Sequence, residues 1–326
     1  MLIPTRQLLP LCALLASTVH TFDAAAQPAW PLKSIRIIVG STPGGGPDIT
    51  ARIVAAKLSE SLGQQVVVEN RAGASTMIGA EFVARSPADG YTLLMAGGAH
   101  VASAAMHAKI AYHPLNDFAP VTQVVSLPFV LIAHPSLPAK SMRELIALAR
   151  NKPAAIQYGS SGTGTPPHLS MELLLSMTGV RMLHVPYKGN SQAMIDVLAG
   201  HVQAMMQSAP PALPHIKAGR LRALGVTGGK PLTSLPDVPP IADAGVAGYE
   251  SVQWYGVLAA AGTPREIVAR LQGDIAKILQ QRDIRERLLA DGAEPVGSTP
   301  EQFTSFLRSE LDKWVKLVKT TGIKPD

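Results

Sequence analysis

Cysteine is almost absent from this chain of 326 residues, which contains one, Cys12. Cys12 lies in an N-terminal segment that we expect to be removed, so the mature protein would contain no thiol and no disulfide. The residues before it, Leu9-Pro10-Leu11, are not the small residues that normally precede a lipid-modified cysteine. We therefore predict no lipid anchor, and a fold that is stabilised by packing alone.

The chain also lacks a long apolar run. Residues 1–26 have the features of a secretory signal peptide: Arg6 in a short positive start, a mostly apolar stretch over 8–19, and small residues at 24–26. The apolar stretch is shorter than the roughly 20 residues that a transmembrane helix requires. We expect cleavage near Ala26-Gln27 and export of the mature chain.

Aromatic residues make up only 5% of the sequence, and its 29 Lys and Arg residues form no dense cluster. The net charge of +6 is unchanged in the mature chain, because residues 1–26 contain one basic and one acidic residue, Arg6 and Asp23. Such a charge attracts anionic solutes weakly. Scattered charge with few aromatics argues against a nucleic-acid partner.

Motifs for metal binding and catalysis are missing as well. His100, His107 and His113 have no standard zinc spacing, and no cysteine or carboxylate cluster accompanies them, so we predict no metal and no cofactor. The glycines at 44–46 are not followed by the Lys-Ser/Thr of a P-loop. Thr163 stands where a nucleophile elbow around Ser161 would require glycine. A serine hydrolase using Ser161 and His168 is the less favoured alternative.

Short apolar runs alternate with helical patterns, which predicts α/β architecture. We expect a loop-rich segment with one short helix over 99–120, and an irregular segment over 231–240. Thr299, Pro300 and Gln302 predict a capping box at the last helix. The expected strands are 35–39, 66–68, 91–95, 129–133, 156–158, 202–206, 221–226 and 254–259, and the expected helices are 48–62, 78–85, 142–150, 166–177, 191–198, 264–281, 284–289 and 300–319.

Two loops, 42–48 and 160–168, have the same construction: a strand, then glycine and small hydroxyl residues, then a helix. Helix starts leave backbone N–H groups unpaired, and glycine lets an anion approach them. Each loop could equally be a structural turn. Asp48 either caps its helix or contacts a ligand, His168 either donates to an anion or packs locally, and Trp254 lies either in the core or in a cleft.

Further short stretches follow these loops in a distinctive order. Through their order and number, the sequence resembles the Bug-type substrate-binding proteins of tripartite tricarboxylate transporters, over nearly the whole mature chain. The stretches are Pro43 to Asp48, Glu69 to Gly73, Asp117 to Val121, Tyr158 to Gly162, Pro166 to Leu169, His184 to Gly189, Ala212 to Gly219 and Leu235 to Pro239.

The resemblance implies a two-lobed periplasmic-binding-protein fold, with two mixed, mainly parallel sheets flanked by helices and a ligand cleft between the lobes. Lobe 1 would comprise 27–127 and 253–326, and lobe 2 would comprise 128–252. Lys188 could equally be solvated surface. The implied ligand contacts are Ser41, Thr42, Pro43, Gly44, Gly45, Asp48, Ser75, Thr76, Met77, Gly98, Ala99 and His100 from lobe 1, and Ser161, Gly162, Thr163, Gly164, Thr165, His168, Lys188 and Gln207 from lobe 2.

The resemblance further implies a periplasmic binding protein without enzymatic activity, which closes around a small organic acid and presents it to a membrane permease. We expect the protein to be a monomer. A sensing partner of a membrane receptor is the alternative. Ser41 replaces a frequent aromatic residue of the family, and Ala74-Ser75 replaces Gly-Gly. Gln207 replaces an aspartate that can meet a ligand amino group, which favours a mono- or dicarboxylate without one.

Overall fold

The computed structural model describes Met1, residues 30–107 and residues 110–323. The expected signal peptide with Cys12 therefore lies outside the described residues. The strands are β1 (Ile35–Val39), β2 (Val66–Asn70), β3 (Thr92–Gly97), β4 (Phe118–Ala133), β5 (Gln157–Ser160), β6 (Leu183–Pro186), β7 (Ala204–Ser208), β8 (Arg222–Val226), β9 (Val252–Ala260) and β10 (Glu294–Pro295). The helices are α1 (Gly46–Leu62), η1 (Ala74–Thr76), α2 (Met77–Ala84), α3 (Gly98–Met106), α4 (Met142–Asn151), α5 (Pro166–Thr178), α6 (Asn190–Ala199), α7 (Ala209–Lys217), α8 (Arg265–Gln280), α9 (Arg282–Ala290) and α10 (Pro300–Thr321).

The strands form two sheets that share β4. The first sheet has the order β2-β1-β3-β9-β4-β10 and the second has the order β6-β5-β7-β4-β8. Each begins with the same arrangement, three parallel strands followed by an antiparallel one: β2-β1-β3-β9 in the first and β6-β5-β7-β4 in the second. Helices α1 and α5 therefore occupy equivalent places, each following the middle parallel strand of its sheet.

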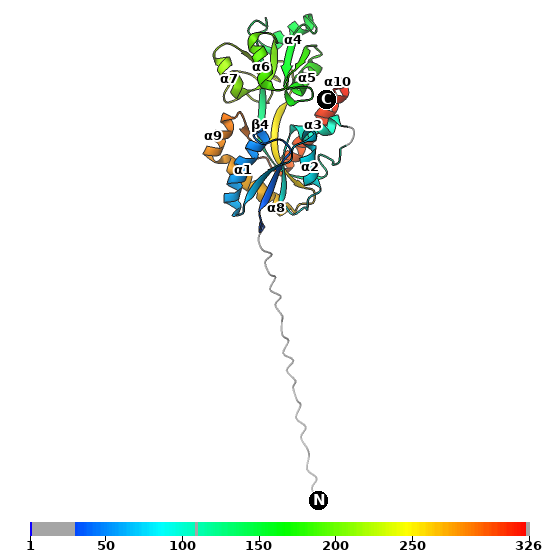
Figure 1. Ribbon diagram of the computed structural model, residues 1–326, viewed down its shortest axis with the longest axis vertical. Coiled ribbons are helices and arrows are strands. Elements are labelled where there is room, and N and C mark those ends of the chain that lie inside the picture. The colour runs from blue at the N-terminus through cyan, green and yellow to red at the C-terminus, as the bar shows by residue number, and fades with distance from the viewer. Residues whose placement is uncertain (2–29, 108–109, 324–326) are drawn as a thin grey trace.

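The expected α/β fold with two lobes and mixed sheets is confirmed, as Figure 1 shows. The expectation that the sheets are mainly parallel is wrong. Of the nine ladders between described strands, four are parallel and five are antiparallel. The reason is that β4 and β9 run antiparallel to their neighbours, and that β8 and β10 both pair with β4.

Strand β4 is the main difference from the sequence-based expectation. Its residues 118–128 pair with β9, its residues 129–133 pair with β7, and its residues 130–133 also pair with β8, so one strand of 16 residues runs through both lobes. The sequence predicted only the second half, because Pro120 and Pro128 interrupt the apolar run. A β-bulge between Pro120 and Thr122 accommodates the first of these prolines.

Helices cover both faces of each sheet, which explains why the parallel strands read as continuous apolar runs. In lobe 1, Ile37 and Leu271 belong to the core on one face, and Trp254 and Phe303 to the core on the other. Trp254 is fully buried, and its indole N–H donates to Glu310 Oε2 (3.3 Å), so the core interpretation of this residue is correct. The capping box at Thr299 is also confirmed, and none of the helices in the described ranges is long and apolar enough to cross a membrane.

Candidate functional site

A small cavity of about 70 Å³ lies between the lobes, beside the carboxyl ends of β1 and β3. In open α/β sheets ligands bind at this end of the strands. Its wall includes Ser41 after β1, Thr76 before α2, the start of α3 at 98–100, and Tyr255 of β9, all from lobe 1. Pro166, the first residue of α5, closes it from lobe 2. Hollows of about 510–600 Å³ on the described surface are larger, but no comparable set of helix starts converges on them.

The start of α3 supplies the hydrogen-bond donors of this cavity. No side chain caps the helix at Gly97, and none of Gly98, Ala99 and His100 is proline, so the first amides of the helix have no partner within it. The partial positive charge of a helix start adds to their attraction for an anion. The start of α5 in lobe 2 offers no such donors at its first two positions, because Pro166 and Pro167 carry no N–H. The cavity therefore has a donor-rich side in lobe 1 and a proline side in lobe 2.

The first glycine-rich loop is held by Asp48. Asp48 is 2% exposed, and its Oδ2 accepts from the Gly44 N–H (2.9 Å) and from Arg52 Nε (3.0 Å). Its Oδ1 accepts from Asn70 Nδ2 (3.0 Å) and pairs with Arg52 at 2.9 Å. The Arg52 hydrogen bond lowers the pKa of Asp48 to about 2, against the cost of burial. With these partners in place, Asp48 supports the loop and does not face the cavity.

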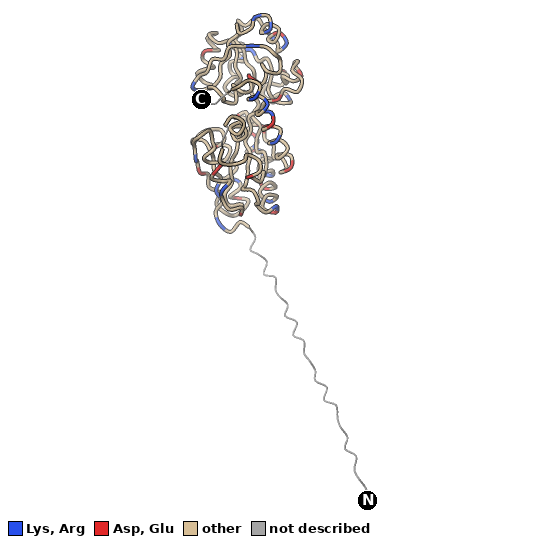
Figure 2. The backbone as a smooth tube through the Cα atoms, turned by 90° about the vertical axis from the view of Figure 1, so that its right-hand side faces the viewer, with Lys and Arg blue, Asp and Glu red and all other residues tan. Residues whose placement is uncertain are grey.

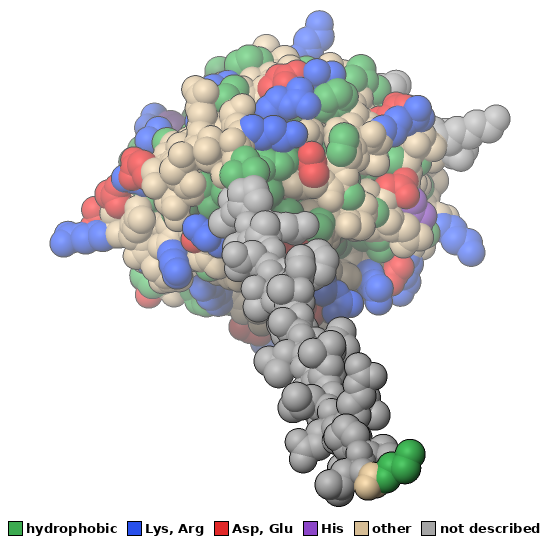
Figure 3. Space-filling model, turned by 90° about the horizontal axis from the view of Figure 1, so that it is seen from below, with side chains coloured by type: hydrophobic (Ala, Val, Ile, Leu, Met, Phe, Trp, Pro, Cys, Tyr) green, Lys and Arg blue, Asp and Glu red, His purple; other side chains and the backbone are tan. Residues whose placement is uncertain are grey.

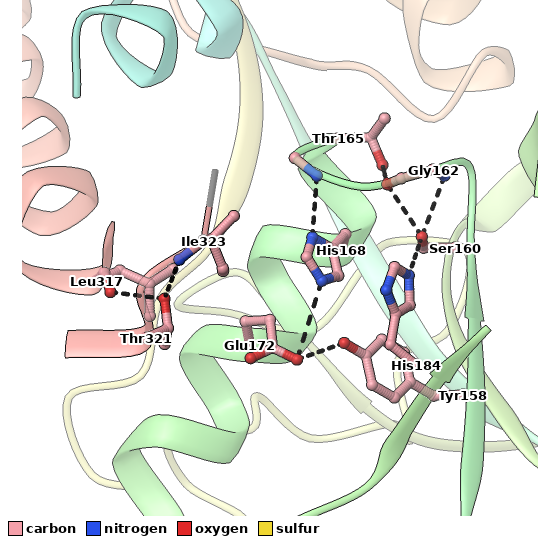
Figure 4. A network of polar contacts seen from close by, with 11 residues as sticks. Tyr158, Ser160, Gly162, Thr165, His168, Glu172, His184, Leu317, Thr321 and Ile323 are labelled. Carbon is pink, nitrogen blue, oxygen red and sulfur yellow. Dashed lines mark hydrogen bonds and ion pairs between the residues drawn. The ribbon is translucent and has the colours of Figure 1, made fainter. Parts of the chain in front are cut away.

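The second glycine-rich loop is held in the same way by His168. This ring is 4% exposed, and its Nδ1 accepts from the Gly164 N–H at 3.0 Å (Figure 4). It stacks on His184 with a centroid distance of 4.0 Å, and His184 Nε2 lies 2.7 Å from Ser160 Oγ. Burial, aided by His184, lowers the pKa of His168 to about 4. His168 is therefore neutral at pH 7 and packs locally, the second of the two interpretations that the sequence allowed.

The two loops agree in backbone conformation as well as in composition. Gly44 and Gly164 have φ of 81° and 74°, a region that favours glycine. The following N-cap residues, Gly45 and Thr165, have φ/ψ of −75°/163° and −74°/157°. In each helix the third residue then reaches back to the glycine amide. The sequence-based expectation of one construction used twice is therefore confirmed at the level of single dihedral angles.

A third loop at the cavity carries backbone strain. Ala74, Ser75 and Thr76 are consecutive non-glycine residues with φ of 44°, 52° and 78°. Such conformations cost about 1 kcal/mol or more each and persist where the surroundings hold them. Ser103 Oγ donates to Ser75 O at 3.2 Å, and Thr76 packs against Gly40, where a Cβ would meet its backbone. The Ala74-Ser75 replacement noted in the sequence thus falls where glycine would relieve strain.

Two polar atoms at the cavity lack a partner among the described residues. They are Ser41 Oγ and His100 Nδ1, and both residues belong to the cavity wall. His100 is 1% exposed, and its Nε2 lies 2.9 Å from Pro114 O, so this nitrogen is the donor. Burial lowers the pKa of His100 to about 4, which keeps the ring neutral at pH 7. The side chain of His100 can therefore only accept a hydrogen bond from a ligand, at Nδ1. Its backbone N–H is one of the donors at the start of α3.

The structure brings only part of the expected contact set to the cavity. Lys188 is exposed, and Gln207 is buried inside lobe 2, where its Oε1 accepts from the Ser208 N–H (2.9 Å). The expected residues in the wall are Ser41, Thr76, Gly98, Ala99 and His100, and those outside it are Thr42, Pro43, Gly44, Gly45, Asp48, Ser75, Met77, Ser161, Gly162, Thr163, Gly164, Thr165, His168, Lys188 and Gln207.

Sequence reasoning missed Tyr255, Gln253 and Pro166 in the cavity wall. Tyr255 follows Trp254 on the strand, and successive side chains point to opposite faces. Trp254 therefore faces one core of lobe 1, and Tyr255 lies in the core on the other face and reaches the cavity, where its hydroxyl accepts from Gln253 Nε2 (2.9 Å) and lies close to Gly46. This alternation along 254–255 is the signal in the sequence that indicates Tyr255.

The hydrolase alternative has no support in the geometry. Ser161 Oγ donates to Thr165 Oγ1 (3.0 Å), while His168 bonds Gly164, so these two residues form no nucleophile–base pair. The Ser–His side-chain contact beside this loop joins Ser160 and His184, and Ser160 is fully buried. Within residues 30–107 and 110–323, no group of three His, Cys, Asp or Glu side chains is placed to hold a metal ion.

Residues 50–323 match the family described as Tripartite tricarboxylate transporter family receptor. The chain belongs to this family. It is 35% identical to Protein BugT of Bordetella pertussis, with 98% of each chain covered. Its family and its solved relatives are solute-binding proteins, so the expectation that the chain is not an enzyme is confirmed.

Two solved relatives of the receptor family carry carboxylates. A protein of R. palustris with adipate is 39% identical, with a TM-score of 0.73 over 91% of this chain and 100% of its own. MatC of Rhodopseudomonas palustris with bound malate is 30% identical, with a TM-score of 0.70 over 89% of this chain and 100% of its own. The resemblance inferred from the short stretches is thus confirmed across the folded chain.

Proposed function

We propose that this receptor-family protein captures a small mono- or dicarboxylate in the cavity between its lobes. The observation that carries the proposal is the uncapped start of α3, whose first amides border an interlobe cavity at the carboxyl ends of parallel strands. Preorganised amides at a helix start suit a carboxylate. The adipate and malate of two relatives support the same ligand class.

The proposal extends to location, movement and partner. The protein would act in the periplasm as a monomer, and lobes 27–127 plus 253–326 and 128–252 would close on the ligand. One bending point would be Pro128-Phe129, where the pairing partner of β4 changes from β9 to β7. The other would be the chain just before β9. The closed form would present its acid to a membrane permease. Acidic and basic residues are interspersed along the backbone of both lobes (Figure 2), and the face drawn in Figure 3 shows side chains of both signs.

A calorimetric screen of carboxylic acids against the purified protein tests the ligand class. We expect saturable binding of at least one mono- or dicarboxylate and a raised melting temperature, since ligand binds only the folded state. Ala99→Pro removes one backbone N–H from the start of α3. The substitution is at the second helical position, where α1 and α5 already have proline. It should weaken binding by about ten-fold or more, the loss of one charge-assisted hydrogen bond.

The matched control is Glu266→Pro, at the second position of α8, where the side chain is exposed and outside the cavity wall. It should leave affinity unchanged. Binding confined to amines or amino acids would contradict the proposal. So would an Ala99→Pro protein that binds its acid as tightly as the parent.

A further inference from the structure

Asp48 and His168 share one geometric position in two lobes. Each is the third residue of its helix, each is buried, and each accepts the N–H of the glycine four residues earlier, at 2.9 Å and 3.0 Å. The accepting atoms also correspond, because Oδ2 of aspartate and Nδ1 of histidine are both bonded to Cγ. A carboxylate in lobe 1 and a neutral imidazole in lobe 2 therefore perform the same task.

We propose that His168 is a positioning residue of the ligand site, the lobe 2 counterpart of Asp48, and that its protonation releases the second loop while the first stays formed. The inference rests on the proposed carboxylate binding, because affinity is one of its readouts. It places neither side chain in contact with the ligand. What His168 fixes is the path of the chain from Gly164 to Pro166, which closes the cavity from lobe 2.

The mechanism follows from which nitrogen carries the proton. Nδ1 accepts from the Gly164 amide, so the proton of the neutral ring is on Nε2, which lies 4.0 Å from Glu172 Oε1. A second proton could go only to Nδ1, where it would face the Gly164 N–H, donor against donor. The loop must then move. Gly164 lies next to the Met106 side chain of α3 in lobe 1, so a movement of the loop changes a contact between the lobes. Asp48 does not change from acceptor to donor between pH 7.5 and pH 4, because its pKa of about 2 keeps both oxygens unprotonated.

The titratable groups packed around His168 come from three elements (Figure 4). From its own helix comes Glu172, whose carboxylate also accepts from the Tyr158 hydroxyl. From β6 comes His184, stacked on the ring, and from β5 comes Tyr158, with a centroid distance of 6.3 Å. Burial together with His184 keeps His168 neutral, with a pKa of about 4. Glu172 is the anion of this group, and it lies beyond hydrogen-bond distance of the ring.

The test compares two substitutions at one position. His168→Asn keeps a δ acceptor that does not titrate, and His168→Leu removes the acceptor while keeping an apolar side chain of similar reach. At pH 7.5, with the acid identified in the screen, we expect the Asn protein to bind within about three-fold of the parent, and the Leu protein at least ten-fold more weakly. Near-UV circular dichroism and the melting temperature show whether both proteins fold. Nitrogen-15 spectra of the imidazole should show Nδ1 unprotonated and Nε2 protonated in the parent.

The pH profile separates positioning from mere packing. Between pH 7.5 and pH 4, the parent should lose about two-fold more affinity than the Asn protein, because a group with a pKa of about 4 is half protonated at pH 4. Protonation of the ligand itself affects both proteins equally. Equal affinities of the Leu and Asn proteins, a protonated Nδ1 at neutral pH, or identical pH profiles would each overturn the inference. If the parent binds no carboxylate at all, the proposed function fails instead.

Discussion

At the residue scale, Gly46 shows how the cavity limits the side chains around it. A Cβ at this position would collide with the Tyr255 hydroxyl, which belongs to a residue that is 5% exposed and forms part of the cavity wall. Tyr255 is tied to Gln253 by a hydrogen bond of 2.9 Å, so its ring has little room to withdraw. The first helical residue of α1 and the aromatic residue on β9 therefore fit each other as a pair.

We predict that Gly46→Ala destabilises the protein by about 1–3 kcal/mol, the usual cost of overpacking, and weakens ligand binding at the same time. Urea unfolding and calorimetry measure the two effects. Gly273→Ala in α8 is the matched control, because a methyl group there would meet no other part of the protein within 4 Å and the φ of Gly273 is not positive. That change should be neutral or slightly stabilising. Equal effects of the two substitutions would contradict this account.

At the element scale, α10 is attached to the chain crossing through one buried cluster. Glu310 is 3% exposed and accepts from the indole N–H groups of Trp254 (3.3 Å) and Trp314 (3.2 Å). Lys313 pairs with Glu310 and donates to Glu250 O at 3.1 Å, just before β9. The cluster thus joins the C-terminal helix to the segment that enters lobe 1 from lobe 2.

Lys313→Met should leave Glu310 buried without its cation, and we expect the free energy of unfolding to fall by about 3 kcal/mol. Glu310→Gln keeps the size of the side chain but removes the charge that Lys313 neutralises. In the double variant the two losses should be clearly less than additive, which urea unfolding of the four proteins measures as a coupling energy. Strict additivity would show that the ion pair contributes nothing to the attachment of α10.

At the scale of the whole molecule, two buried neutral histidines set how stability depends on pH. Burial lowers the pKa of His100 and of His168 from 6.5 to about 4. Between these values the unfolded chain binds protons that the folded chain does not, so stability falls as the pH falls from 6.5 to 4. Each histidine accounts for about 3 kcal/mol of this loss at pH 4. Asp48, with a pKa of about 2, adds a further loss only below about pH 4.

Urea unfolding at pH 7, 5.5 and 4.5 measures this dependence. Stability should decline steadily across the series, and the decline should be smaller in a protein carrying His100→Phe and His168→Asn. His201, whose side chain is 74% exposed, provides the control, since His201→Asn should leave the slope unchanged. A double variant with the slope of the parent would mean that other groups control acid sensitivity.

Much of this molecule could be predicted from its sequence, for reasons that differ by element. The strand at 35–39 and the helix that follows the glycines at 44–46 were predicted closely because periodicity and turn residues are local signals. The first half of β4 and helix α7 were not, since prolines within them suppress both patterns. Strand β6 is short and only partly buried, which leaves little pattern to detect.

The expected loops of lobe 1 border the cavity, but most of the side chains expected to contact a ligand do not. The expected ligand contacts of lobe 1 lie in the segments 41–48, 75–77 and 98–100, and each segment contributes at least one residue to the cavity wall. Whether Asp48 faces the cavity or its own loop depends on Arg52, one turn later in the same helix, and on Asn70, which only tertiary structure places beside it. His168 likewise depends on tertiary structure, because the ring that stacks on it, His184, lies on β6, while its partner amide belongs to the loop before its own helix.

The position of β9 has a consequence for how the molecule is assembled. This strand lies between β3 and β4 in the first sheet, although it is the ninth of ten strands along the described chain. Until residues 252–260 have been synthesised, β3 has no neighbour on that side, and β4 lacks the strand with which it shares its longest ladder. Lobe 1 therefore cannot complete its core from its N-terminal half alone, and a nascent chain remains open to chaperones until its last quarter emerges.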